Sequence, residues 1–89
     1  MTAVIVYTTF SNTTEARRMA EDLVERHLAA CCNIFPGMIS VFEWGSEFGN
    51  GEEVAMMIKT TEDRVQKIYD HISANHSYEV PALVHWRID

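Results

Sequence analysis

The segment around His76 carries the side chains best suited to binding a metal ion. His76 is followed closely by Tyr78 and Glu79, and a neutral imidazole beside a carboxylate is a reasonable ligand pair for a divalent metal. Loops on a rigid scaffold often carry function. The competing interpretation is that His76 and Tyr78 bond to the backbone and fix the start of the next strand. The sequence therefore predicts His76 as a metal ligand, with a structural role as the alternative.

The two cysteines, Cys31 and Cys32, are neighbours in the sequence. Their thiolates would suit a soft metal ion, but adjacent residues of a strand face opposite sides, so one of the two must face inward. We expect an inert core thiol rather than a ligand. With no CxxC motif and no second pair of cysteines there is no disulfide framework, and the cytoplasm, where thiols stay reduced, is the expected location.

The other three histidines receive structural interpretations. His27 lies four residues before Cys31, which is a ligand spacing only within one helix. We expect that helix to end near residues 28–30, with His27 on its apolar stripe. His71 and His85 are expected to be ordinary surface or interface residues.

Catalytic and nucleotide-binding sites find little support in the sequence. An acylphosphatase-like site needs a loop after the first strand that cradles phosphate with backbone amides and an arginine, and residues 9–12 read TFSN. A Cys31 nucleophile would need an exposed thiol in an electropositive setting. The helix start at residues 12–14 would suit an anion, but no glycine-rich or lysine-bearing cradle accompanies it. We expect no catalytic activity and no tight ATP site, and a small ligand in a cleft between subunits stays open as an alternative.

Length and charge limit the functional classes further. The 89 residues suffice for one domain, 1–89. Seven Lys and Arg against 13 Asp and Glu give a formal charge of −6, which argues against nucleic acid and anionic membranes as partners. The apolar run after Met1 is too short to span a bilayer and lacks the features of a signal peptide.

Two amphipathic helices are predicted. The first starts after Asn12, which can cap it, with Glu15 placed to complete a capping box. The second is capped by Thr60 or Thr61, has acidic residues in its first turn and ends near residue 75. Their apolar stripes are Ala16, Met19, Ala20, Leu23, Val24, His27 and Leu28 in the first helix, and Val65, Ile68, Tyr69 and Ile72 in the second.

Four strands are predicted around these helices. Residues 3–8 are apolar at nearly every position, as in a buried central strand. Residues 31–60 indicate a long ribbon of two antiparallel arms, the first interrupted at Pro36-Gly37, and the last strand covers Val80 to Ile88. On the first arm, one face carries Met38, Phe42 and Trp44, and the other carries Ile39 and Val41. On the second arm, one face carries Val54, Met56 and Ile58, and the other carries Ala55 and Met57.

The element order β-α-β-β-α-β predicts an α+β fold, a ferredoxin-like sandwich with a long hairpin between its second and third strands. Both helices would cover one face of the sheet and leave the other bare. A ribbon that is apolar on both faces is marginal alone in water. We therefore expect the bare face and the ribbon to pack against other copies of the chain in a homo-oligomer.

Several separated motifs resemble those of the CutA family, the divalent-cation-tolerance proteins. The stretch LAACCNI at residues 28–34 is similar to the family's LAACVNI, and HSYEVP at residues 76–81 is similar to its HPYEVP. Residues 53–60 match the spacing E-V-x-x-x-I-K-T, and the likeness covers essentially the whole chain. It implies a ferredoxin-like protomer in a tight homotrimer with interlocking hairpins. It also implies links to copper and other divalent-metal tolerance, without an accepted catalytic activity.

The chain departs from the family pattern at positions that bear on a metal site. The family's Trp-x-Gly-Lys is WGSE at residues 44–47, its proline before the tyrosine is Ser77, and its glutamate after the later proline is Ala82. Some bacterial members are credited with a copper site made of a first-strand cysteine and a His-His pair. The matching positions here are Tyr7, Asn75 and His76, so only His76 survives.

These features predict a cytoplasmic, CutA-like, non-catalytic homotrimer that binds divalent metal, copper first, weakly or in a regulatory role near His76 in clefts between subunits. The alternative is a P-II-like trimeric signalling or scaffold protein that binds a small ligand or a protein partner. Family members usually continue into a further strand segment and a C-terminal helix, which we expect to be absent or cut away after Asp89.

Overall fold

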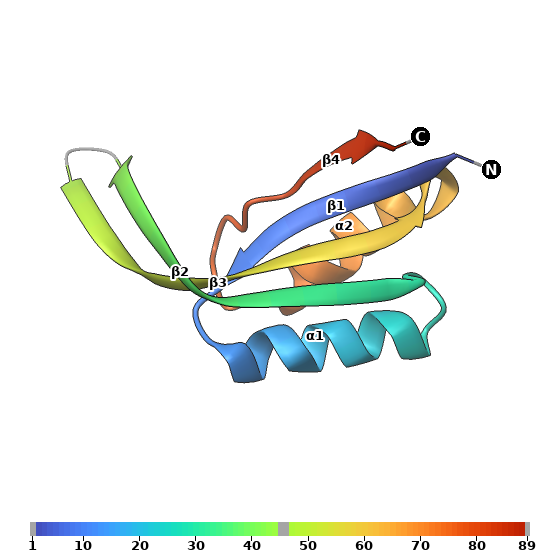
Figure 1. Ribbon diagram of the computed structural model, residues 1–89, viewed down its shortest axis with the longest axis horizontal. Coiled ribbons are helices and arrows are strands. Elements are labelled where there is room, and N and C mark those ends of the chain that lie inside the picture. The colour runs from blue at the N-terminus through green and yellow to red at the C-terminus, as the bar shows by residue number, and fades with distance from the viewer. Residues whose placement is uncertain (1, 45–46, 89) are drawn as a thin grey trace.

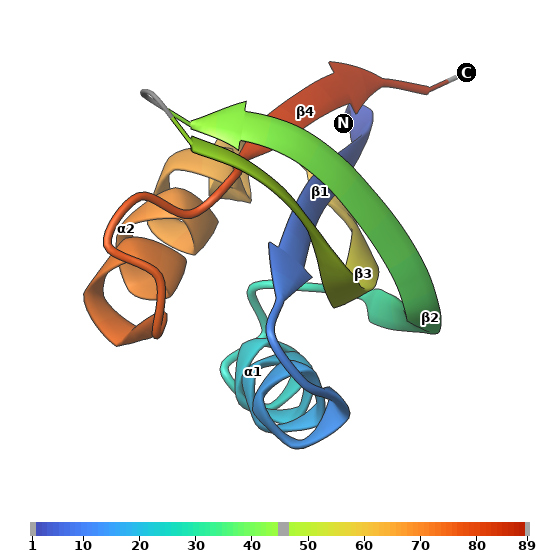
Figure 2. The ribbon, with the colours of Figure 1, turned by 90° about the vertical axis from the view of Figure 1, so that its left-hand side faces the viewer.

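The computed structural model describes residues 2–44 and 47–88, and the side chains within 2–43 and 53–88. These residues form β1 (Ala3–Phe10), α1 (Thr13–Glu25), β2 (Cys31–Trp44), β3 (Glu47–Thr61), a 3₁₀ turn (Glu62–Arg64), α2 (Val65–Asn75) and β4 (Val84–Arg87). The four strands make one antiparallel sheet in the order β2-β3-β1-β4. Both helices lie on the same side of it (Figure 1, Figure 2). The predicted α+β, ferredoxin-like arrangement is confirmed.

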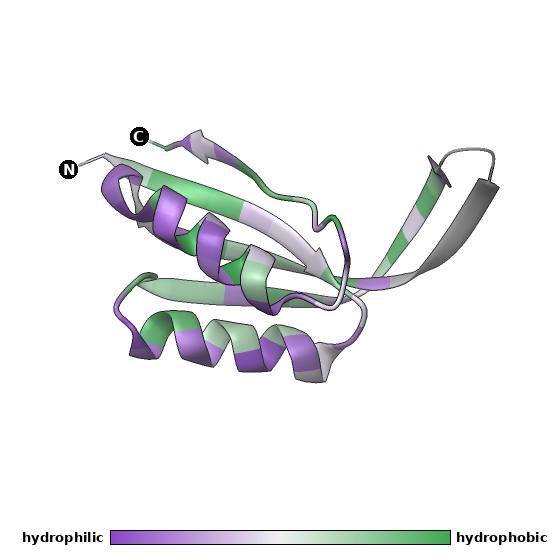
Figure 3. Ribbon diagram, turned by 180° about the vertical axis from the view of Figure 1, so that it is seen from behind, coloured by the Kyte–Doolittle hydropathy of each residue, from purple (hydrophilic) through white to green (hydrophobic). Residues whose placement is uncertain are grey.

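The core lies between the sheet and the two helices. Alternate residues of the central strands β1 and β3 point toward the helices and meet the apolar stripes of α1 and α2. Figure 3 shows purple and green alternating along both helices, as expected of elements with one buried and one solvated face. The fully buried side chains include Val4, Val6, Phe10, Leu23, Met56, Ile58, Ile68 and Ile72.

The helix starts follow the prediction to different degrees. At α1 the side chain of Asn12 accepts a hydrogen bond from the N–H of Glu15 at 2.8 Å, which confirms the cap. At α2 the predicted cap is wrong: the hydroxyl of Thr60 donates to the carbonyl of Leu28 at 2.7 Å, and Thr61 makes no capping hydrogen bond within the described part of the chain. A 3₁₀ turn with the predicted acidic residues leads into α2 instead.

The end of α1 comes earlier than residues 28–30, so that prediction is wrong. The helix ends at Glu25, and His27 adopts the left-handed conformation, with a φ of 59°. The N–H of His27 then bonds to Val24, and the N–H of Leu28 bonds to Leu23, each at 3.0 Å. This is the Schellman pattern, which usually places glycine at the left-handed position. His27 is consequently exposed and does not lie on the apolar stripe.

The strands β2 and β3 form a long hairpin that leaves the plane of the sheet. Phe35 pairs with Ala55 and Met38 pairs with Glu53, so three steps along β2 match two steps along β3. The extra residue is accommodated as a bulge at Pro36-Gly37, the predicted interruption, where Gly37 has a φ of 80°. Beyond this bulge the ribbon bends away from the rest of the sheet (Figure 1).

Many apolar side chains of the sheet stay open to solvent. Val54, Met56 and Ile58 share one face as predicted, and the structure shows that this face points into the core. The predicted facing of Trp44 lies outside the described side chains. The large apolar side chains of the ribbon and the sheet that are between 43% and 82% exposed include Phe35, Ile39, Val41, Phe42, Val84 and Trp86. This surface supports the expectation of an oligomer.

The strand β4 is shorter than predicted. It covers Val84–Arg87 rather than Val80 to Ile88, and it pairs with residues 4–7 of β1. Pro81 has no N–H to donate to a ladder, and residues 76–83 form a loop that crosses from the end of α2 to the edge of the sheet (Figure 2). This loop carries the predicted site residue His76.

Candidate functional site

The ring of His76 is fixed between β1 and its own loop. Its Nε2 atom donates to the carbonyl oxygen of Thr9 at 2.7 Å, and its Nδ1 atom accepts the N–H of Tyr78 at 2.9 Å. A carbonyl only accepts and an amide only donates, so this geometry fits the neutral ring with its proton on Nε2. The ring also stacks on Phe10, with centroids 4.6 Å apart. Both ring nitrogens are bonded to the backbone, as the structural interpretation of His76 expected.

The next residue, Ser77, is bonded to the first turn of α1. One carboxylate oxygen of Glu15 accepts the hydroxyl of Ser77, and the other accepts the N–H of Ser77, both at 2.9 Å. Burial alone would raise the pKa of Glu15, but the hydrogen bonds from the side chain and backbone of Ser77 lower it below the usual value. Glu15 therefore joins α1 to the loop, in addition to its place beside the Asn12 cap.

The third residue, Tyr78, reaches the base of the hairpin. Its hydroxyl donates to the carboxylate of Glu53 on β3 at 2.9 Å. Burial, together with this bond to Glu53, raises the pKa of Tyr78 to about 12. Hydrogen bonds from Ser40 and Tyr78 lower the pKa of Glu53, so its carboxylate is ionised at neutral pH. Residues 76–78 are thus connected to β1, α1 and β3, three elements that are far apart in the sequence.

Sequence reasoning placed the wrong carboxylate beside His76. Glu79, the predicted neighbour, is exposed, whereas Glu15 and Glu53 are the acidic groups that contact the following two residues. Their signals in the sequence were indirect, since Glu15 sat in a capping-box position and Glu53 in a family-like motif. No spacing links either to His76, because the two contacts span 62 and 25 residues.

One chain offers few free ligands for a metal ion at this site. Among the side chains that the structure describes, those of residues 2–43 and 53–88, no group of three or more His, Cys, Asp or Glu is placed to hold a metal ion. A metal bound at His76 would have to replace the hydrogen bond to Thr9 or the one from Tyr78. The geometry is therefore compatible with weak binding, with further ligands supplied by water or by a second copy of the chain.

The two cysteines are free and half-buried on opposite faces of β2. Cys32 packs against the core, and burial, with a smaller effect of Cys31, raises its pKa to about 11. A thiol with so high a pKa is a poor ligand and a poor nucleophile at neutral pH, which agrees with the predicted core thiol. Cys31 lies on the face without helices, directly across from Lys59.

The remaining histidines make specific contacts. The ring of His85 bonds to the hydroxyl of Tyr69 at 2.6 Å. The prediction of an ordinary surface or interface residue does not fit His71. It contacts Asp22 between the two helices, and only 16% of its side-chain surface is exposed. Of the helices that the structure describes, none combines the length and the apolar character that spanning a bilayer requires.

Comparison with known proteins relates this arrangement to one family. A family described as "CutA1 divalent ion tolerance protein" matches residues 4–89. The "Divalent-cation tolerance protein CutA" of Thermus thermophilus is 38% identical over 80 residues, covering 90% of this chain and 78% of that protein. "Protein CutA, chloroplastic" of Arabidopsis thaliana is 35% identical over 82 residues, covering 92% of this chain and 45% of that protein.

Solved structures show the same fold. The crystal structure of CutA1 from Oryza sativa superimposes with a TM-score of 0.96 at 34% identity, covering 100% of this chain and 82% of that one. CutA from Archaeoglobus fulgidus superimposes with a TM-score of 0.94 at 36% identity, covering 98% and 84%. The chain spans about half the length of the first curated relatives that it matches. It covers 45%, 46% and 52% of the full length of three of these relatives.

Proposed function

The chain belongs to the CutA1 divalent ion tolerance family, and from this membership we propose that it acts as a non-catalytic homotrimer that binds divalent metal weakly, copper first, with His76 as a ligand. The bound metal would lie in a cleft between subunits. Relatives from Thermus thermophilus and Archaeoglobus fulgidus are named divalent-cation tolerance proteins, which supports a role with divalent metal here.

The observation that carries the proposal is the position of His76 in a loop whose next two residues bond to ionised carboxylates. Glu15 and Glu53 both have lowered pKa values and bond to the residues directly after His76. Two negative charges near an imidazole favour a cation. Because a metal must displace a backbone hydrogen bond of the ring, binding is weak and is coupled to movement of the loop.

Assembly as a trimer draws support from the open apolar surface. Phe35, Phe42 and Trp86 are each more than two-fifths exposed, and a second copy would remove them from water. We propose the cytoplasm as the compartment because both cysteines are free. Relatives are named for other places, the chloroplast in Arabidopsis thaliana and the periplasm for the Archaeoglobus fulgidus structure.

Native mass spectrometry of the reduced protein during titration with copper and zinc tests the proposal. We expect a trimer that takes up three metal ions, and we expect His76→Ala to lose them. His27→Asn is the matched control, because His27 is an exposed imidazole on the far end of α1. A monomer would contradict the assembly, and unchanged uptake in His76→Ala would contradict the assignment of the ligand.

A second candidate function is favoured by the same ring geometry. Both nitrogens of His76 already have partners, so the loop is complete without a metal. A trimer that stays metal-free in the titration would then act as a P-II-like signalling or scaffold protein, binding a small ligand or a protein partner. Competition between metal and a labelled ligand separates the two functions.

A further inference from the structure

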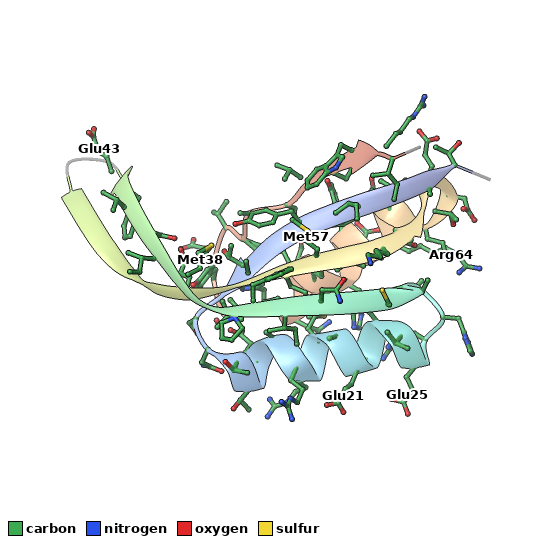
Figure 4. All side chains as sticks on the ribbon, viewed as in Figure 1. Glu21, Glu25, Met38, Glu43, Met57 and Arg64 are labelled. Carbon is green, nitrogen blue, oxygen red and sulfur yellow. The ribbon has the colours of Figure 1, made fainter. Side chains whose placement is uncertain are left out.

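The sheet face that carries no helix bears two described side chains of opposite charge. Side chains of a strand alternate between its two faces, and Met56 and Ile58 of β3 point into the core. Glu53, Met57 and Lys59 therefore lie on the other face, and Figure 4 shows Met57 on the side of the sheet away from α1. Among the described side chains of the four strands, Glu53 and Lys59 are the only charged groups on this face.

Glu53 and Lys59 cannot pair within one chain. Six residues of extended strand separate them, which corresponds to about 20 Å at roughly 3.3 Å per residue. Neither forms an ion pair with another described side chain. Hydrogen bonds from Ser40 and Tyr78 hold the pKa of Glu53 below its usual value. One face of the sheet thus presents an ionised carboxylate and an exposed ammonium, each without a counter-ion among the described groups.

The surroundings of Lys59 are mostly apolar. In the register of the sheet, Lys59 lies between Cys31 of β2 and Ile5 of β1, and Trp86 of β4 lies beyond Ile5. Trp86 is 43% exposed in the single chain. A protein surface that covered this row of side chains would also bury the ammonium of Lys59, which is costly unless a carboxylate pairs with it.

A second copy of the same face supplies the required charges. It brings a carboxylate for Lys59 and an ammonium for Glu53, whereas a partner that carries one sign of charge would match only one of the two. A carboxylate has about four acceptor sites, so Glu53 can accept an ammonium in addition to the hydroxyl of Tyr78. The face is therefore complementary in charge to another copy of itself.

We propose that Lys59 of one copy pairs with Glu53 of the next copy in the assembled protein. The pair presupposes the homotrimer of the proposed function and identifies the contact that aligns its copies. Because each copy uses two different patches, the contact is head-to-tail, and such contacts close into a ring when the rotation permits. The ammonium of the second copy lies beside the hydroxyl of Tyr78, which bonds to Glu53. The cluster that follows His76 is then completed by a residue of another copy.

The test is zero-length coupling of carboxylates to amines with a carbodiimide in the reduced, native protein, followed by mass spectrometry of the peptides. The chain has two lysines, Lys59 and Lys67. We expect a link between Lys59 and Glu53 in covalent dimers and trimers. Such a link must join two copies, because about 20 Å of strand separates the two residues within one. Lys67, exposed on α2, is the internal control and should form no link to Glu53.

Variants of Lys59 separate the charge from the reactive amine. Lys59→Arg keeps the charge, so we expect it to keep the mass of the assembly and to lose the link. Lys59→Glu would bury two carboxylates together, and we expect it to weaken association at least about tenfold. Lys67→Glu makes the same change of charge on the exposed side of α2 and should leave association unchanged. Light scattering over a range of protein concentrations measures all three.

The link in the unaltered protein decides the inference even if a variant fails to fold. A trimer in which Lys59 forms no link to Glu53 would overturn it and leave the trimer of the proposed function in place. Unchanged association in Lys59→Glu would have the same meaning. A monomeric unaltered protein, established by light scattering before the coupling, would overturn both the pair and the proposed trimer.

Discussion

The hydroxyl of Tyr78 donates a 2.9 Å hydrogen bond to the carboxylate of Glu53, which joins the loop after α2 to the base of the β2–β3 hairpin. Tyr78→Phe removes a hydrogen bond to a charged acceptor, and we expect it to lower the free energy of unfolding by about 1.5 kcal/mol. Urea unfolding at one fixed protein concentration measures the change. Tyr7→Phe is the control, since the Tyr7 hydroxyl bonds to the weak acceptor sulfur of Met38 at 3.5 Å. Equal losses in both variants would contradict the role of Glu53.

Acid should destabilise the protein through its carboxylates. The pKa values of Glu15, Glu53 and Asp22 are lowered in the folded chain. Their contribution to stability is therefore fully present above the unfolded pKa values of about 4 and is lost as the pH falls through the lower folded values. Unfolding by urea from neutral to acidic pH gives the slope. In Glu53→Gln the slope should be shallower, and an unchanged slope would exclude Glu53 as a contributor.

Glycine should stabilise the end of α1. His27 is exposed and has a φ of 59°, a conformation that costs residues with a Cβ about 1 kcal/mol. We expect His27→Gly to raise the free energy of unfolding by about 1 kcal/mol, whereas His27→Ala should change it little because alanine keeps the Cβ. Thermal and urea unfolding of both variants measure the difference. A gain of the same size in the alanine variant would show that loss of the imidazole, rather than backbone strain, is responsible.

A charge on the ribbon should break up the assembly. Phe42 is 49% exposed in the single chain, and we expect Phe42→Glu to dissociate the proposed trimer because a carboxylate would be buried without a partner. Light scattering after size-exclusion chromatography reports the mass. Arg17→Glu, on the exposed side of α1, is the control and should leave the mass unchanged. If the Phe42 variant also keeps its mass, this residue lies outside the interface.

Elements with strong local signals could be predicted from the sequence. The spacing of Leu23, Ile68 and Ile72 identified the helical faces that form the core, and Asn12 identified a cap. Pro36-Gly37 identified an interruption of the first arm, which the structure shows to be a bulge. Each of these signals depends on residue type and short spacing, which are visible in one chain.

Features that depend on distant contacts or on an unusual conformation could not be predicted. Nothing in the type of His27 marks a left-handed helix end, where glycine is the usual signal. The pairs Glu15–Ser77 and His71–Asp22 join residues 62 and 49 positions apart. Sequence patterns place such residues on faces of elements, but only the packing of the two helices decides which faces meet.

The bulge at Pro36-Gly37 also sets the phase of side-chain alternation along β2. Before the bulge, Phe35 pairs with Ala55, so odd-numbered residues of β2 share a face with odd-numbered residues of β3. After the bulge, Met38 pairs with Glu53, so even-numbered residues of β2 share a face with odd-numbered residues of β3. Deleting one residue here would allow an unbroken ladder in which Met38 still pairs with Glu53, so every later side chain of β2 would keep its face. The core residues of β1, β3 and the helices would keep their positions. The extra residue therefore bends the ribbon without changing which side chains of β2 share a face with their partners on β3, so the direction of the ribbon and the facing of its side chains are separable by one residue.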